Sequence, residues 1–287
     1  MMDNKIAILT DTTSSVQYSN HTYDNIFVLP HTVIFGSEEY VDGVDITNDE
    51  FFRRIVEEDV IPSTSQPSIG QTIEICEEIK RQGYTDIIYL PISKGISSTY
   101  NSIVGSIDLI EGINFKVVDT KATAVHLGFM ALEAARLTKE NTSVEEIITY
   151  VEHLRDNLHI YFMVDDLKYL IKNGRLSNAA GFLGSLLKIK PVLEFDDEGR
   201  IIGTEKIRTT KRTMETIVNH VIEATKDCKK VQYTVCHGFD MELLAKFKEE
   251  LKRITDLENF LILPLPSVIG AHVGNGVVSV GYFIIEE

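Results

Sequence analysis

The sequence predicts an α/β protein made of two α/β domains. Its 287 residues are too many for one ordinary core, and the balance of 44% apolar and 25% charged residues is that of a globular protein. In the first part of the chain, short apolar runs alternate with amphipathic segments, which is typical of a parallel sheet covered by helices on both faces. We therefore expect a three-layer α/β/α domain with a parallel sheet over residues 1–157, and a smaller α/β domain with a mixed sheet over 158–287.

The elements of the first domain follow from apolar runs and helix caps. Thr47, Ser68 and Ser143 each stand three residues before a Glu or Gln, which is the capping-box pattern that opens a helix. Short runs bounded by polar residues predict strands. The expected strands are 5–10, 26–35, 86–90 and 115–118, and the expected helices follow the three caps and cover 98–110 and 123–137.

Three polar loops follow expected strands. They are 11–15, 91–98 and 119–123, and all are rich in Ser and Thr. Because the carboxyl ends of parallel strands meet at one edge of a sheet, these loops are expected to lie together and to carry function.

The second domain begins with a different pattern. A strand over 161–164 precedes a short helix over 167–172 and an uncharged helix over 179–187. The turn residues 196–199 between two β-rich segments predict a hairpin, and a hairpin among helices indicates a mixed sheet. The later elements are expected at 213–225, 232–236, 243–253, 260–263 and 277–285.

The net charge of −15 argues against general binding to nucleic acids or anionic membranes, since phosphate repels such a surface. The charge is uneven, because residues 1–157 carry 11 Lys and Arg against 25 Asp and Glu, whereas 158–287 carry 17 against 18. The stretch from Lys168 to Arg212 contains ten basic residues and five acidic ones. This stretch is either an ordinary solvated face or a contact for an acidic partner or a phosphate.

Cysteine and histidine spacing gives no metal site. Cys76, Cys228 and Cys236 show no CxxC spacing, and no two of the eight histidines stand two or four residues apart. We expect reduced, buried cysteines, no metal and no cofactor. No apolar run approaches the roughly 20 residues of a membrane span, and the first residues lack an apolar signal core, so we expect a cytoplasmic protein without stable membrane insertion.

Several motifs run in order along the chain. The most distinctive are Thr64-Ser65-Gln66-Pro67-Ser68, the Ser-rich segment 93–101, and Gly270-Ala271-His272-Val273-Gly274-Asn275-Gly276. Together with 11–14, 119–120, 173–177, 190–191 and 208–209, they resemble the DegV family from residue 11 to 276. The glycine-rich segment departs from the family pattern by lacking both of its usual prolines, and Pro fixes φ in such a turn.

The resemblance implies two α/β domains that bury a long-chain fatty acid. It further implies a carrier subunit (FakB-like) that is not itself an enzyme. A separate ATP-binding subunit, the fatty acid kinase, would phosphorylate the carboxylate to an acyl phosphate for phospholipid synthesis.

Neutral hydroxyl donors suit a buried carboxylate, because they hold it without burying a second charge. Thr64 and Ser97, with their neighbours Ser65 and Ser98, are the expected head-group residues, and the resemblance adds His272. Ser97 has an alternative role as a helix N-cap, and His272 as a turn residue.

The expected walls of the acyl-chain pocket come from two apolar helices. They are Phe182, Leu183 and Leu186 in the uncharged segment, and Phe129 and Met130 in helix 123–137. Ordinary core packing is the alternative for both sets.

Arg175 and Arg208 are expected, from the resemblance, to contact the kinase subunit or the transferred phosphate, for which a guanidinium fork is suited. Structural ion pairs are the alternative for these two arginines.

Three rival classes are weaker. A serine hydrolase would use Ser97 as nucleophile and His272 as base, but the segment lacks the last Gly of a nucleophile elbow and lies several residues after the strand. A direct ATP-dependent kinase would need a phosphate-binding loop, and no G-x-x-x-x-G-K-[ST] motif is present. A purely structural protein leaves the Ser and Thr loops without a role.

Overall fold

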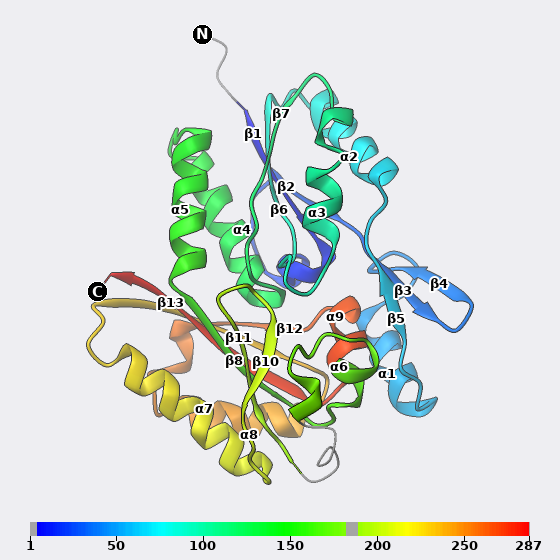
Figure 1. Ribbon diagram of the computed structural model, residues 1–287. Helices are drawn as coiled ribbons and strands as arrows, with labels where there is room; N and C mark the ends of the chain where they lie inside the picture. Colours follow the sequence, from blue (N-terminus) through cyan, green and yellow to red (C-terminus); the bar gives the residue numbers. More distant parts are fainter. Residues whose placement is uncertain (1–4, 182–188, 287) are drawn as a thin grey trace.

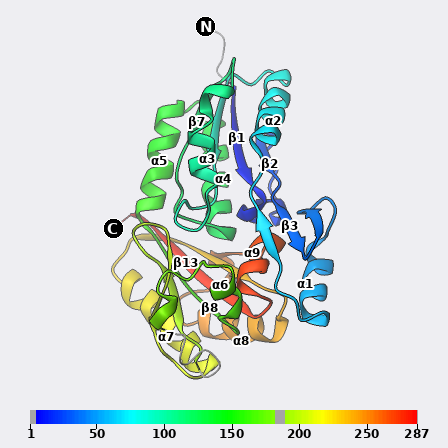
Figure 2. The same cartoon turned by 45° about the vertical axis from the view of Figure 1, so that its right-hand side comes forward.

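The computed structural model describes residues 5–181 and 189–286. Its first sheet is parallel and has the strand order β2-β1-β6-β7. Helices α2 and α3 cover one face, and α4 and α5 cover the other (Figures 1 and 2). The strands are β1 (Ile6–Asp11), β2 (Ile26–Leu29), β6 (Asp86–Leu90) and β7 (Asn114–Val117), and the helices are α2 (Ile69–Arg81), α3 (Thr99–Val104), α4 (Ala124–Thr138) and α5 (Val144–Asp156).

Strand β1 shows why this sheet needs helices on both faces. Ile6 and Ile8 pack in the cluster that includes α4 and α5, whereas Ala7 and Leu9 pack in the cluster that includes α2 and α3. Side chains alternate between the faces of a strand, so an uninterrupted apolar run is buried from both sides. The predicted three-layer arrangement is confirmed.

The capping residues act as expected. Ser68 and Ser143 both form full capping boxes, and the Thr47 side chain accepts a hydrogen bond from the Glu50 backbone amide (3.2 Å) at the start of α1 (Asn48–Glu57). The expected helix 98–110 is shorter, because α3 ends at Val104 and only a 3₁₀ turn, Ile107–Leu109, follows.

The expected strand 26–35 is two strands in different sheets. The chain leaves the parallel sheet after β2 at Pro30, which has no amide hydrogen to donate to a ladder. It then forms β3 (Thr32–Phe35), which pairs antiparallel with β4 (Glu38–Val41) and β5 (Ser63–Ser65). This small sheet places the Thr64 motif on a strand.

The second large sheet is mixed, with the order β10-β9-β8-β13-β11-β12. The predicted hairpin is β9–β10, with Gly199 at φ +71° in its turn. Helices α7 and α8 pack on one face, and the other face turns toward α4 and α9. The strands are β8 (Leu158–Val164), β9 (Val192–Phe195), β10 (Ile201–Glu205), β11 (Lys230–His237), β12 (Phe260–Pro264) and β13 (Val277–Glu286). The helices are α6 (Lys168–Lys172), α7 (Thr210–Thr225), α8 (Met241–Leu251) and α9 (Ser267–Val273), with 3₁₀ turns at Thr12–Ser14, Val16–Tyr18, Ala179–Gly181 and Leu257–Asn259.

The two large sheets come from different parts of the chain. All strands of the parallel sheet precede residue 157, and all strands of the mixed sheet follow it. Helix α9 nevertheless packs on α1, β3 and β5 of the earlier part. The division into two domains at residue 157 therefore stays a prediction. Across the ranges 5–181 and 189–286, no helix has the length and apolar character of a membrane span.

Candidate functional site

A narrow cavity lies where the two parts of the chain meet. The empty space between its walls amounts to about 760 Å³, and this volume includes open solvent at the mouth of the cavity. Its walls are mainly apolar and come from the mixed sheet, from α9 and from the loop after β6. The main wall residues are Ile92, Ile96, Ile160, Phe162, Phe195 and Leu265.

Strand periodicity explains the wall that the mixed sheet provides. On β8, Ile160 and Phe162 face the cavity, whereas Tyr161 and Met163 pack toward α7 and α8 on the opposite face. The same sheet therefore closes its own outer core and leaves an apolar inner surface.

Polar groups gather at one part of this cavity. A hydrogen bond of 2.8 Å joins Thr64 Oγ1 and His272 Nε2, and both residues line the cavity together with Ser97 and Arg175. Thr64 comes from β5, Ser97 from the loop before α3, and His272 from α9, so three distant segments meet here. These four residues are called the polar end below.

Arg175 lies at the opening, because it is exposed and also lines the cavity. The chain turns sharply after α6 at Gly174 (φ +68°), and the Arg175 Nε then donates to the Ile96 carbonyl (3.2 Å). Asn173 donates to the Ala271 carbonyl (2.9 Å) and so ties this turn to α9 beside His272. The Asn-Gly-Arg motif thus holds its arginine against the polar end.

His272 is neutral at pH 7. Burial, together with the nearby Arg175 and His31, lowers the pKa of His272 to about 3. Its Nδ1 is enclosed and has no hydrogen-bond partner among the described residues. The segment that lacks the two prolines begins in α9, which ends at Val273, and Gly274 (φ +78°) caps the helix by donating its amide to the Gly270 carbonyl (2.8 Å).

Ser97 lies one residue before the N-cap position of α3, which Ser98 occupies, and its role as a head-group residue stays a prediction. Its hydroxyl accepts from the Thr99 amide (3.2 Å) at the start of α3, and it also lines the cavity. Ser65 and Ser98 are exposed and do not line the cavity, and Ser98 donates instead to the Gln66 side chain (2.7 Å).

The expected chain-pocket residues do not line this cavity where the structure describes them. Met130 is fully buried in the core that α4 forms with α5, and the Phe129 ring packs on Phe283 of β13 at 4.7 Å. Both belong to the core, which was their alternative. Phe182, Leu183 and Leu186 lie outside the described residues.

Arg208 is exposed, precedes α7 and does not line the cavity. Arg175 and Arg208 are thus placed differently, one at the opening and one on the outer surface.

Sequence reasoning missed other cavity residues. The three loops at the carboxyl edge meet as expected, through Thr13, Ile92 and Thr123. His31 and His126 also line the cavity, although neither was singled out. Apart from its place just after Pro30, His31 carried no local signal, because no sequence pattern shows that the chain changes sheets there.

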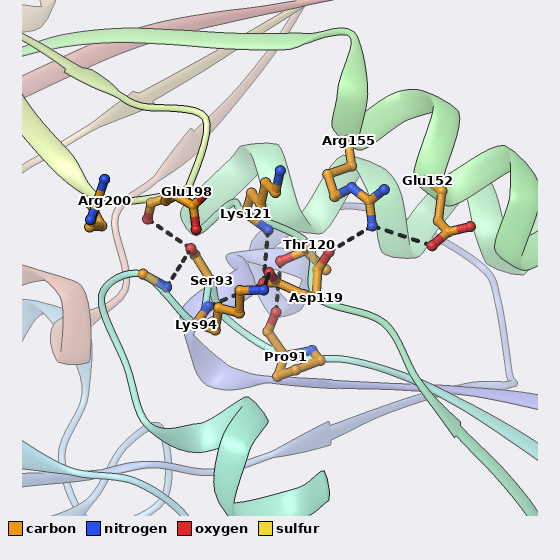
Figure 3. Close-up of polar contacts among 12 residues, drawn as sticks. Pro91, Ser93, Lys94, Asp119, Thr120, Lys121, Glu152, Arg155, Glu198 and Arg200 are labelled. Carbon is orange, nitrogen blue, oxygen red and sulfur yellow. Dashed lines mark hydrogen bonds and ion pairs between the residues drawn. The ribbon is translucent and has the colours of Figure 1, made fainter.

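A polar network fixes the loop that carries Ser97 (Figure 3). Lys94 pairs with Asp119 (3.4 Å), and Ser93 donates to the Gly199 carbonyl of the β9–β10 turn (2.8 Å). A Cβ on Gly95 would lie 2.4 Å from the Gly199 carbonyl, so the two backbones touch closely. This contact joins the loop of the first part to the hairpin of the second.

Ser97 and His272 do not form the hydrogen-bonded pair of nucleophile and base that a serine hydrolase needs. Ser97 Oγ bonds to Thr99 Oγ1 (2.8 Å) and His272 Nε2 bonds to Thr64, so these two candidates are not joined to each other.

Comparisons with known proteins agree with the motifs. The family model described as "Uncharacterised protein, DegV family" matches residues 5–284. A DegV domain-containing protein of Staphylococcus aureus (strain N315) is 35% identical and the match covers 97% of each chain. A fatty acid binding DegV family protein from Streptococcus agalactiae has a similar structure, with a TM-score of 0.88 and 28% identity over 98% of this chain and 99% of that one. The Fatty Acid Kinase (Fak) B3 protein of Streptococcus pneumoniae, loaded with linoleic acid, shares the fold with a TM-score of 0.83 and 17% identity over 98% and 99% of the two chains. Because the family model covers nearly the whole chain and the staphylococcal relative matches throughout, this chain belongs to the DegV family.

Proposed function

We propose that this chain binds one long-chain fatty acid, with the carboxylate at the polar end and the acyl chain along the apolar walls. The observation that carries the proposal is the cavity itself, whose walls are mainly apolar and which Thr64, Ser97, His272 and Arg175 also line. The fatty acid binding relative from S. agalactiae, which has the same fold, supports it.

The energetics favour a ligand of this kind. Burying about fifteen methylenes contributes a gross free energy of about 12 kcal/mol, because each is worth about 0.8 kcal/mol. The polar end therefore orients the carboxylate more than it sets the affinity. Hydroxyl and neutral imidazole groups suit this task, and the exposed Arg175 adds one positive charge at the opening.

We further propose that the chain is a carrier that presents the carboxylate to a separate ATP-dependent kinase subunit. This step rests on the family resemblance and on the exposure of Arg175 beside the head-group residues. The kinase subunit would supply ATP and form the acyl phosphate, while this chain would hold the acyl group.

Mass spectrometry of co-purifying lipid tests the binding function. Protein made in bacteria is extracted under denaturing conditions, and about one long-chain fatty acid per chain is expected. Ile96→Trp, which places a larger side chain in the wall and so narrows the cavity, is expected to reduce this lipid content. Val44→Trp, at an exposed position 74% accessible, is the matched control and should keep it. Wild-type protein without stoichiometric lipid and without uptake of added fatty acid would contradict the proposal.

A further inference from the structure

His31 has a buried imidazole ring in the cavity wall, and the proposed function gives it no role. It is 4% exposed and lines the cavity that also contains Thr64 and His272. Its backbone amide donates to Thr12 Oγ1 (3.1 Å), which fixes the main chain. Its ring Nδ1 has no hydrogen-bond partner within residues 5–181 and 189–286.

The ring faces a buried carboxylate. His31 Nδ1 lies 4.0 Å from Asp11 Oδ1, and Asp11 is fully buried at the end of β1. Asp11 is itself held in place, because its Oδ1 accepts from the Thr13 amide (3.0 Å) and its Oδ2 from the Ile92 amide (3.2 Å). A carboxylate beside one nitrogen of an imidazole orients the ring and leaves the other nitrogen for a ligand.

The charges around His31 come from several elements. Asp11 of β1 lies nearest, His272 of α9 lies on the cavity side, and Arg175 beyond α6 stands at the opening. Asp42, after β4, is a second buried carboxyl near Asp11, and burial raises its pKa to about 6. Burial lowers the pKa of His31, while Asp11 acts in the opposite direction. Without ligand, His31 is therefore neutral at pH 7.

An anionic ligand changes this balance. A fatty-acid carboxylate at the polar end adds a negative charge to a partly buried site beside His31, which already has the Asp11 carboxylate 4.0 Å from its Nδ1. In such surroundings an uncompensated charge is costly, and a nearby anion favours the charged form of an imidazole.

We propose that His31 is a further head-group residue that takes up one proton when the carboxylate binds. A proton from the solvent forms an N–H bond, so that one ring nitrogen donates to the ligand carboxylate while the other faces Asp11. This inference rests on the proposed fatty-acid binding and adds a specificity for anionic over neutral head groups.

Titration calorimetry in two buffers of different ionisation enthalpy at pH 7 measures the proton uptake. Delipidated wild-type protein is expected to take up about one proton per bound palmitate and none with hexadecanol. His31→Gln should abolish the uptake and weaken palmitate binding by about tenfold or more, the range of a lost hydrogen bond to a charged group, with hexadecanol unchanged within about twofold. His220→Gln, outside the cavity beside Glu205, is the matched control and should keep the uptake.

The outcomes separate the two proposals. Wild-type protein that binds neither palmitate nor hexadecanol overturns both. Palmitate binding without proton uptake, or uptake that persists in His31→Gln and disappears in His272→Gln, overturns the role of His31 alone. If His31→Gln does not fold, His31→Leu takes its place. A second measurement uses wild-type protein labelled with ¹³C-histidine. The NMR signal of the His31 ring is expected to shift to the position of protonated imidazole when palmitate is added, and to stay unchanged with hexadecanol. A ring signal that does not move overturns the proposal.

Discussion

Thr64 and Ser65 are neighbours on β5, and their side chains have different surroundings. Thr64 lines the cavity and bonds to His272, whereas Ser65 is exposed and lies outside it. Adjacent residues of a strand point to opposite faces, so one motif supplies both a cavity-lining side chain and a solvated one. The motif predicted the place of the site, but only the strand direction decides which hydroxyl serves it.

Thr64→Val is expected to weaken fatty-acid binding modestly. Valine keeps the shape of threonine and removes the hydroxyl, and a neutral hydrogen bond is worth about 0.5–1.5 kcal/mol, or about two- to twelvefold in affinity. The acyl chain supplies most of the affinity and is untouched. Calorimetric titration with palmitate measures the change, and Ser65→Val is the control. Equal affinities for both variants would place the carboxylate elsewhere.

His126 is a buried histidine that links α4 to the mixed sheet. Its ring bonds to Thr234 (2.7 Å) and Ser279 (3.3 Å), and burial lowers its pKa to about 3. In the unfolded chain a histidine has a pKa of about 6.5, so between these two values the unfolded state binds the extra proton. The free energy of unfolding must therefore fall as the pH drops from about 6.5 toward 3.

His126→Gln is expected to make stability less dependent on pH. One histidine of this kind contributes a slope of at most about 1.4 kcal/mol per pH unit, and the variant should lose most of it between pH 6 and 4. Urea unfolding at several pH values measures the slope. The exposed His153→Gln on α5 is the control. Parallel curves for wild type and His126→Gln would show that His126 is protonated in the folded protein.

At the scale of elements, the predictions succeeded where a local signal decides the structure. Capping boxes fixed the starts of α2 and α5, and the turn 196–199 fixed the β9–β10 hairpin. The strand expected over 26–35 divides because β2 and β3 find partners in different sheets, which no local pattern specifies. Helix α9 was not expected, because Gly270 disfavours a helix interior; its packing on α1 explains this glycine, since a Cβ there would lie 2.6 Å from the Phe52 ring.

Helix α4 shows the limit of periodicity. It is apolar nearly all round, so its sequence could not say which side faces the cavity. The structure turns Ala124 and His126 toward the cavity and leaves Met130 in the core.

Gly128 fixes the approach of α4 to the first loop, and Gly128→Ala is expected to destabilise the protein. A Cβ there would lie 2.3 Å from the Ser14 carbonyl oxygen, and a backbone atom yields only if the helix shifts, at a cost of about 1–3 kcal/mol. Gly70→Ala on α2 is the matched control, because its Cβ would meet nothing closer than 3.8 Å. This variant should raise the free energy of unfolding by up to about 1 kcal/mol. Thermal and urea unfolding compare the two. A stabilising Gly128→Ala would show that α4 can move away from the loop.

On the scale of the whole molecule, the cavity exists because segments far apart in sequence meet. Thr13, Thr64, Ser97, Arg175 and His272 come from five separate segments. All five lie in the family motifs and four of them were expected site residues, but their common cavity depends on how the mixed sheet faces the parallel one. His31 could not be identified from its neighbours alone, since its environment is set by Asp11 from another strand.

At this scale, the two arginines of the basic stretch can be tested separately, because Arg175 lines the cavity and Arg208 does not. If Arg208 contacts the kinase subunit from the outer surface, Arg208→Ala should slow acyl-phosphate formation while the lipid content stays unchanged, because Arg208 does not line the cavity. Arg175→Ala, at the opening, should lower both lipid affinity and coupling. Arg208→Lys keeps the charge but loses the guanidinium fork and should restore only part of the rate.

Steady-state assays with the kinase at several salt concentrations measure this coupling. The effect of Arg208 should shrink as salt rises, because exposed charges are screened over about 8 Å at physiological ionic strength. Arg53→Ala on α1, which removes another exposed arginine from the acidic part of the chain, is the matched control and should leave the rate unchanged. Unaltered kinetics in Arg208→Ala at low salt would return Arg208 to an ordinary surface residue and leave Arg175 as the arginine that links the cavity to a partner.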